Sequence, residues 1–390
     1  MPTAAPPTPL SARALAPDLA RGALLLFIAV ANAPWYLWTG QTRGLSAWPV
    51  EASSADRIVQ SISLVAIDGR SYPMFAALFG YGIWQLYSRQ LAAGADTVAA
   101  RRLLQRRHAW MIAFGLIHAA LLWAGDILGA YGLFGLVVCW FFLECRDRTL
   151  AGWAIVLSVG FVAYSAVLLA GASTSGSDLG IATADYRDSI DARLLDWFVS
   201  TPFVAFLFVV PIAVITAILA ARHRVLENPA DHLPLLRGVA ISGIAVGWIG
   251  GGLVAAQNAD VFGDASLDLT FSLLQNLTGL AAGLGYVALF GLNAARIRTP
   301  GRVTNALRQL GSRSLTFYLA QSLAFAPVMS AWGLGLGAHL SSWSIALYAV
   351  AVWLVSLAAA VILGGLGIRG PAETLLRWLS YRAKRSTTAP

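Results

Sequence analysis

The sequence predicts an all-α fold, a polytopic transmembrane helical bundle of about ten spans, and three observations carry this prediction. Of 390 residues, 58% are apolar and 12% are charged, and the mean hydropathy is +0.68. A soluble domain has about 25% charged residues. Apolar runs of 17 to 24 residues follow one another along the chain, long enough to cross a bilayer as helices. The basic residues, finally, gather in alternate connecting segments.

The spans follow from hydropathy, with breaks at charged residues, proline and glycine. In chain order they are 19–38, 71–88, 107–124, 127–144, 150–171, 202–221, 237–256, 269–290, 313–331 and 341–364. Asp18 and Arg21 stand at the entrance of the first span, and Pro73 suits the first turn of the second. Gly125 separates the third span from the fourth, which predicts a tight hairpin at the outer surface.

The distribution of basic residues predicts the orientation. With the N-terminus in the cytoplasm, the inside segments hold 22 of the 27 basic residues and the outside segments hold five. The positive-inside rule therefore favours an N-in, C-in arrangement with an even number of spans. Topology accounts for the net charge of +8, so nucleic acid is not expected as a partner.

Composition divides the chain into three parts. Residues 1–17, rich in alanine, proline and threonine, predict a disordered cytoplasmic tail; 18–370 form the transmembrane domain; 371–390 predict a cytoplasmic amphipathic segment. Outer segments 40–70 and 173–200 are predicted to contain helices at the membrane interface. In the second, an apolar stripe is expected opposite Asp188, Asp191 and Arg193, and its members are Tyr186, Ile190, Leu194 and Trp197.

His118 is the only histidine well inside a predicted span. A neutral imidazole there can act as base or nucleophile near pH 7. In a continuous helix Asp126, eight residues on, would lie about 12 Å away. The break at Gly125 lets the chain turn, so that Asp126 could orient the imidazole as a carboxylate orients a catalytic histidine. Asp126 could equally cap the fourth span, and the sequence leaves both roles open.

Five further polar residues are candidates for binding a substrate or acyl-CoA, because polar groups in spans are costly and often functional. They are Arg21, Asn32, Arg70, Tyr318 and Gln321. A local ion pair with Asp18 is the alternative for Arg21, and interhelical hydrogen bonds are the alternative for the uncharged residues. No histidines or cysteines show metal-ligand spacing, so no metal is expected.

Several stretches together resemble a known family. DLARGALLLFIAVAN, YPMFAALFGYG, LIHAALLWAGDILGAYGLFG, GSRSLTFYLAQS and GPAETLLRWLSY, between residues 18 and 382, are similar in order to the signature blocks of the YeiB family. Its members are inner-membrane proteins catalogued as a domain of unknown function, which implies a multi-pass protein of the bacterial plasma membrane. Ala20 stands where the family usually has leucine, and Phe317 where it usually has asparagine.

The resemblance also implies an activity. The YeiB family is grouped, by distant resemblance, with membrane-bound acyltransferases that include acyltransferase family 3 and the lysosomal heparan-glucosaminide acetyltransferase. Those enzymes transfer an acyl group from cytoplasmic acyl-CoA to a polar acceptor across the membrane and use an intramembrane histidine. The resemblance thus implies an acyltransferase-like domain with His118 catalytic, Asp126 beside it and acetyl-CoA as donor.

A transporter or exporter of a small polar molecule is the alternative function. In that case Asn32, His118, Asp126 and Gln321 would line the path. The partners expected are the lipid bilayer, the acyl-CoA donor and an unidentified polar acceptor. The sequence leaves a homo-oligomer open.

Overall fold

The fold is helical throughout the part of the chain that the structure describes, as predicted. The computed structural model describes residues 13–42, 46–171, 180–262 and 265–381. The helices of the first half are α1 (Leu15–Asn32), α2 (Ser54–Ala66), α3 (Ser71–Ala92), α4 (Thr97–Leu121), α5 (Leu128–Val137), α6 (Asp147–Gly171) and α7 (Tyr186–Phe206). Those of the second half are α8 (Val210–Arg222), α9 (Leu233–Asn258), α10 (Asp268–Arg296), α11 (Arg302–Gly311), α12 (Ser314–Met329), α13 (Ser342–Gly365) and α14 (Pro371–Tyr381).

Short turns of tighter or wider helix join these elements. The 3-10 turns are Ala33–Tyr36, Pro229–His232, Ala265–Leu267 and Leu336–Ala338, and a π turn, Val138–Phe142, extends α5. Within the described ranges the only β pairing is an isolated bridge between Thr42 and Pro49.

In the described part of the chain, five helices are long and apolar enough to cross a membrane. They are Leu15–Tyr36, Asp147–Val167, Pro229–Asn258, Asp268–Arg296 and Ser342–Gly365. The bent pair α7 and α8 would make a sixth crossing, and Leu128–Phe142 and Ser314–Met329 are shorter apolar helices. All ten ranges predicted as spans fall on helices of the structure.

The predicted span 202–221 is not one straight helix. α7 ends at Phe206, α8 begins at Val210, and the two are bent by 45°. Pro202 lies inside α7, and Pro211 occupies the first turn of α8. Proline lacks the N–H that a continuous helix needs but fits a first helical turn, so the sequence favours a restart here.

The ends of the predicted parts also differ from the helix bounds. α1 begins at Leu15, so residues 15–17 of the predicted tail belong to it, and Ala16 is 1% exposed. α14 lies in the predicted C-terminal segment, and its Leu376 is buried against the bundle. Residues 1–12 of the tail, 172–179 of the second outer segment and 382–390 at the C-terminus lie outside the described residues.

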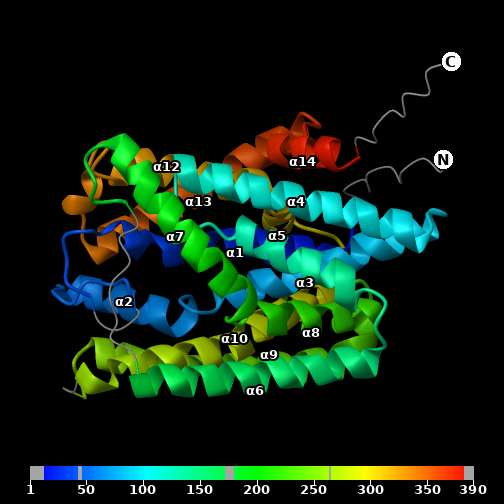
Figure 1. Cartoon of the computed structure of the whole chain (residues 1–390), viewed down its shortest axis with the longest axis horizontal. Helices are drawn as coiled ribbons and strands as arrows, with labels where there is room; N and C mark the ends of the chain where they lie inside the picture. The colour runs from blue at the N-terminus through cyan, green and yellow to red at the C-terminus, as the bar shows by residue number, and fades with distance from the viewer. Residues whose placement is uncertain (1–12, 43–45, 172–179, 263–264, 382–390) are drawn as a thin grey trace.

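α1 runs through the middle of the bundle, while α6 lies along one edge (Figure 1). In the most apolar stretch of 18 residues, 67% of the residues are buried inside the protein for the helix that begins with α1, and 17% for α6. The main core gathers around α1, α3, α4, α5 and α8, with Leu24, Met74, Leu104, Tyr131 and Val214 fully buried. The apolar surface of α6 therefore faces outward, as expected of a helix in contact with lipid.

α7 crosses diagonally over α4 and α5 (Figure 1). The prediction that placed Arg193 opposite the apolar stripe is wrong, because Arg193 is 1% exposed and shares the buried face with Trp197. The outward face carries apolar side chains instead, with Leu195 70% and Val199 69% exposed. In hydrocarbon the stable arrangement puts polar groups inward and apolar groups outward, the reverse of a helix in water.

Candidate functional site

His118 and Asp126 meet where α4 turns into α5. α4 ends at Leu121 and α5 begins at Leu128. Nδ1 of His118 lies 2.9 Å from Oδ1 of Asp126, and the two residues are 3% and 5% exposed. The turn requires Gly125, since a Cβ there would lie 2.6 Å from the indole nitrogen of Trp123. The break at Gly125 thus brings together the two residues that the sequence singled out.

The second carboxylate oxygen of Asp126 accepts two other hydrogen bonds. The backbone N–H of Gly129 donates to Oδ2 at 2.7 Å, and the indole N–H of Trp197 donates to it at 3.3 Å. The first bond caps the start of α5, and the second ties the turn to α7. Asp126 therefore makes the contact needed to orient His118 and also the contact needed to cap α5.

Two glycines make room for the carboxylate and for its partner Trp197. A Cβ at Gly115 would lie 2.3 Å from Oδ2 of Asp126 and 2.4 Å from the nitrogen of Gly129. A Cβ at Gly129 would lie 2.6 Å from the ring of Trp197. Both separations are far below van der Waals contact, so these positions exclude any side chain while the pair is formed.

The contacts of Asp126 determine the state of the His118 ring. A carboxylate oxygen accepts a hydrogen bond and does not donate one, so the proton between Oδ1 of Asp126 and Nδ1 of His118 belongs on Nδ1. Nε2 is then the lone-pair nitrogen. It is buried, and it has no hydrogen-bond partner among the described residues. The site therefore holds an oriented imidazole with a free basic nitrogen.

Tyr318 of α12 packs against this imidazole, with ring centroids 5.3 Å apart. Its hydroxyl accepts a hydrogen bond from the backbone N–H of Ile127 at 3.3 Å, which leaves its own proton available for donation. Tyr318 and Ile127 also line a small cavity of about 10 Å³, about the size of one water. The other lining residues are Ile28, Asn32, Ser71, Tyr72 and Phe75.

Arg193 holds the end of the helix that carries His118. Its guanidinium donates to the carbonyl oxygens of Ala119 at 3.1 Å and Ala120 at 2.8 Å, and to the hydroxyl of Ser189 at 2.8 Å. Carbonyls in the last turn of a helix have no partner within the helix, so a buried cation is a favourable cap for them. α7 thus fixes the pair from two sides, through Arg193 and Trp197.

Arg70 and Gln321 bind the backbone elsewhere in the bundle. Arg70 is fully buried and donates to the carbonyls of Asp68 and Gly247, which joins the turn before α3 to α9. Gln321 donates from Nε2 to the carbonyl of Leu25 on α1 at 2.9 Å. Neither residue lines the cavity beside Tyr318, whereas Asn32 does.

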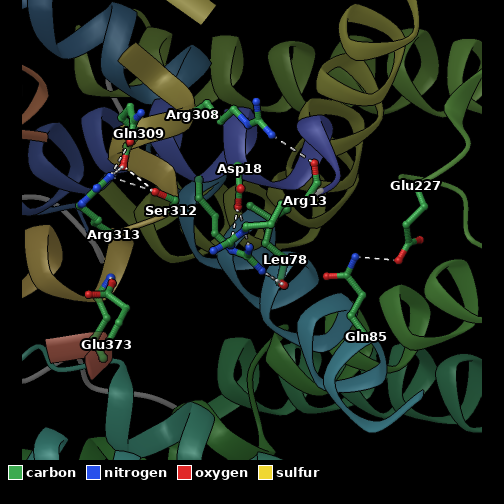
Figure 2. A network of polar contacts seen from close by, with 12 residues as sticks. Arg13, Asp18, Leu78, Gln85, Glu227, Arg308, Gln309, Ser312, Arg313 and Glu373 are labelled. Carbon is green, nitrogen blue, oxygen red and sulfur yellow. Dashed lines mark hydrogen bonds and ion pairs between the residues drawn. The ribbon is translucent and has the colours of Figure 1, made fainter. Parts of the chain in front are cut away.

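Arg21 lies toward the arginine-rich end of the bundle. It forms an ion pair with Asp18 at 3.5 Å, the alternative that the sequence offered, and donates to the carbonyl of Leu78 at 3.0 Å. Arg13 also donates to Asp18, at 2.7 Å (Figure 2). Arg21 precedes the cavity residue Ile28 by seven positions, about 10 Å along α1. It is therefore separate from the His118 pair.

Two comparisons with known proteins found similarities, one to a protein family and one to individual proteins. A family described as "Protein of unknown function (DUF418)" matches residues 220–383. The uncharacterized protein YxaH of Bacillus subtilis (strain 168) is 26% identical over 366 residues, covering 84% of this chain and 83% of that protein. The uncharacterized protein YeiB of Escherichia coli (strain K12) is 26% identical over 337 residues, covering 80% and 81%. These similarities support membership of the YeiB family.

The family match covers only part of the site. Residues 220–383 include Tyr318 and Gln321 but not the turn with His118 and Asp126. The similarity to YeiB and YxaH extends over most of the chain. The pair thus comes from the N-terminal half of the chain and the tyrosine from the C-terminal half, and the fold brings them into contact.

Sequence reasoning missed the residues that support the pair. The sequence placed Arg193 and Trp197 in an interfacial helix and assigned no role to Gly115 or Gly129. A signal for the glycines existed: each stands three positions from a member of the pair, in a hairpin whose helices must approach closely. No local signal in the sequence marks Arg193 as buried, because a charged residue of an amphipathic helix is expected on the exposed face, whereas Arg193 is 1% exposed.

His108 is a second buried histidine that the sequence placed at a span end. α4 begins at Thr97, well before the predicted boundary of 107, so His108 lies inside the helix and is 1% exposed. Its ring fits the space left by Gly135, and neither ring nitrogen has a hydrogen-bond partner in the described ranges. The same ranges contain no group of three or more histidine, cysteine, aspartate or glutamate residues that could hold a metal.

Proposed function

We propose that this protein is a transmembrane acyltransferase that moves an acyl group from cytoplasmic acyl-CoA to a polar acceptor at the outer face of the membrane. One observation carries the proposal: His118 is buried, its Nδ1 is held by Asp126, and its Nε2 has no partner among the described residues. His108 also leaves its ring nitrogens without a partner in the described ranges, but no carboxylate orients its ring, as Asp126 orients His118. An unused, oriented Nε2 is what a general base requires.

The chemistry then follows from the free nitrogen. Nε2 takes the proton from a hydroxyl or amine of the acceptor as its oxygen or nitrogen bonds to the thioester carbonyl carbon. The carbon–sulfur bond breaks, and the thiolate that leaves takes the proton from the imidazolium. Asp126 stabilises the positive ring, and the Tyr318 hydroxyl donates to the carbonyl oxygen. Its acceptance of the Ile127 N–H, which leaves its own proton available, supports this role.

Access to Nε2 requires a side chain to move, because His118 is 3% exposed. We propose Tyr318 as that side chain, since it contacts the imidazole and lines the adjacent cavity. On the donor side, Arg107 lies eleven residues before His118 on α4, about 16 Å away. Arg21 and Arg107 are candidates for the phosphates of the donor, because guanidinium groups bind phosphate well.

The proposal includes a topology: ten crossings of the bacterial inner membrane with both termini in the cytoplasm. The excess of basic residues in alternate segments supports it. A phosphatase reporter that needs the periplasm, fused after Pro390, should be inactive. An active reporter would place the C-terminus outside and reject the N-in, C-in arrangement.

The activity is tested by transfer of labelled acetyl from acetyl-CoA to acceptors in inverted membrane vesicles. The His118→Ala variant should lose transfer but remain folded, since Asp126 keeps its bonds to Gly129 and Trp197. The matched control is His339→Ala, an exposed histidine before α13, which should transfer normally. Normal transfer by the His118 variant would reject the proposal. Uptake or efflux that depends on His118, without acetyl transfer, would favour the transporter.

A further inference from the structure

A groove of about 530 Å³ runs between α9 and α10, away from the His118 pair. Its lining residues are Arg237, Ala240, Ile241, Ile244, Ala245, Leu289, Leu292, Asn293 and Arg296. On each helix they recur at spacings of three and four, so one face of each helix forms a wall. From Arg237 to Ala245 the groove extends about 12 Å along α9.

The polar residues of the groove lie at one end. Arg237 follows the start of α9 at Leu233, and Arg296 is the last residue of α10. Asn293 is one turn before Arg296. All three are exposed, and their side chains form no hydrogen bond or ion pair in the described part of the chain. Two guanidinium groups and an amide thus remain available at this end.

The rest of the groove is apolar and open to the surroundings of the bundle. Ile241 is 72% exposed and Leu289 is 37% exposed. Apolar side chains on α9 extend this surface, with Leu235 at 54% and Ile249 at 68%. In a bilayer such a surface faces hydrocarbon, while the arginines lie at the end that the basic residues assign to the cytoplasm.

We propose that this groove binds an anionic phospholipid. The phosphate lies between Arg237 and Arg296, with Asn293 as a further donor, and one acyl chain lies along Ala240, Ile244 and Leu289. Charge complementarity selects the occupant: basic pockets between transmembrane helices on the cytoplasmic side bind anionic headgroups, and that leaflet carries the anionic lipids. A neutral lipid would fill the apolar part but leave two arginines unpaired.

Native mass spectrometry of the full chain in detergent, titrated with phosphatidylglycerol or with phosphatidylcholine of the same acyl chains, tests the proposal. Wild type should prefer phosphatidylglycerol. The double variant Arg237→Gln, Arg296→Gln should bind it about tenfold or more weakly, because two charged contacts are lost. The control Arg298→Gln, Arg302→Gln removes the same charge outside the groove and should bind as wild type does.

A further variant separates the groove from its charge. Ala245→Trp fills the apolar part and keeps both arginines, so it should also weaken binding of phosphatidylglycerol. Glycerol phosphate, the free headgroup, should not compete. Equal binding of the two lipids by wild type, equal losses in the two double variants, or unchanged binding in Ala245→Trp would each overturn the proposal.

Discussion

At the scale of single residues, Asp126 is the centre of the candidate site. One oxygen holds the imidazole of His118, and the other accepts from Gly129 and Trp197. An acceptor with three partners on three segments of chain is fixed in position. The direction of the imidazole is therefore set by backbone and side-chain donors that belong to α5 and α7.

Asp126→Asn tests this orienting role. The asparagine oxygen can still cap α5, but its amide presents N–H toward His118 and favours the wrong tautomer. Acetyl transfer should fall about 10²- to 10⁴-fold in kcat with little change in KM or thermal stability. Asp191→Asn, on the exposed side of α7, is the control and should be unaffected. If the Asp126→Asn variant keeps the full rate of transfer, the carboxylate only caps α5 and does not orient His118 for catalysis.

Gly115→Ala tests the close fit around the pair. Its Cβ would overlap Asp126 and the backbone of Gly129, so the turn must shift. Thermal unfolding should show a loss of about 1–3 kcal/mol, as for overpacked cores. Gly152→Ala on α6 meets nothing within 4 Å and should be neutral or slightly stabilising. Similar effects of the two substitutions would contradict the packing described here.

At this scale the sequence predicted the pair but not its surroundings. A histidine in a span and a carboxylate after a glycine break are local signals, and the fold brings them together. Trp197 comes from 71 residues further along the chain. Tyr318 comes from another half of the molecule, and its contact with the ring depends on helix packing that no local spacing encodes.

At the scale of elements, α7 packs across the end of α4 and holds it by hydrogen bonds from Arg193. Its buried face carries Ser189, Arg193, Trp197 and Thr201 at intervals of four. The first half of its outer face carries charged side chains, and the second half exposes Leu195, Phe198 and Val199. The guanidinium of Arg193 also lies over the rings of Tyr186 and Trp332, at 5.2 and 5.6 Å from their centroids. These contacts fix the helix end that positions His118.

Arg193→Gln should release that helix end. The carbonyls of Ala119 and Ala120 lose their donor in a buried setting, which should cost about 1–3 kcal/mol in unfolding free energy. Arg193→Lys should recover only part, because an ammonium cannot match the planar fork. Arg187→Gln, an exposed arginine of the same helix, serves as control. Equal unfolding midpoints in detergent for wild type, the two Arg193 variants and the Arg187 variant would show that Arg193 does not stabilise this helix end.

Asp56 joins two other elements at their N-termini. It forms a capping box with Ser53 at the start of α2, and its Oδ1 accepts from the backbone N–H of Trp343 at the start of α13. Burial alone would raise the pKa of Asp56, but the hydrogen bonds from Ser53 and Trp343 outweigh it and hold the pKa below its usual value. The ionised form is therefore the stabilising one.

The stability that Asp56 contributes should be present above the unfolded-state pKa, about 3.9, and be lost as the pH falls through the lower folded value. Asp56→Ala should lower unfolding free energy by about 1–2 kcal/mol at pH 7 and should depend less on pH than wild type between 5 and 3. Glu51→Ala removes the same charge nearby from an exposed side chain. Parallel pH profiles of wild type and the Asp56 variant would contradict this cap.

At the scale of the whole molecule, hydropathy predicted where the helices are but not how they bend. All ten predicted ranges fall on helices because apolar runs and their breaks are local properties. The restart between α7 and α8, the early start of α4 and the inverted face of α7 depend on partners distant in sequence. In water an apolar stripe faces the protein core, but in a bilayer it can face lipid while polar side chains face inward. This explains why Arg193 was assigned to the wrong face.

The most direct test of the site is the protonation of the His118 ring, since Asp126 holds Nδ1 and leaves Nε2 as a free base. The chain has five histidines, so ¹⁵N-histidine labelling with His118→Ala for assignment isolates this ring by NMR. The spectrum of wild type should show the proton of His118 on Nδ1 and none on Nε2, and Asp126→Asn should shift that proton. A proton on Nε2 in wild type, alone or in a doubly protonated ring, would show that Nε2 is not a free base.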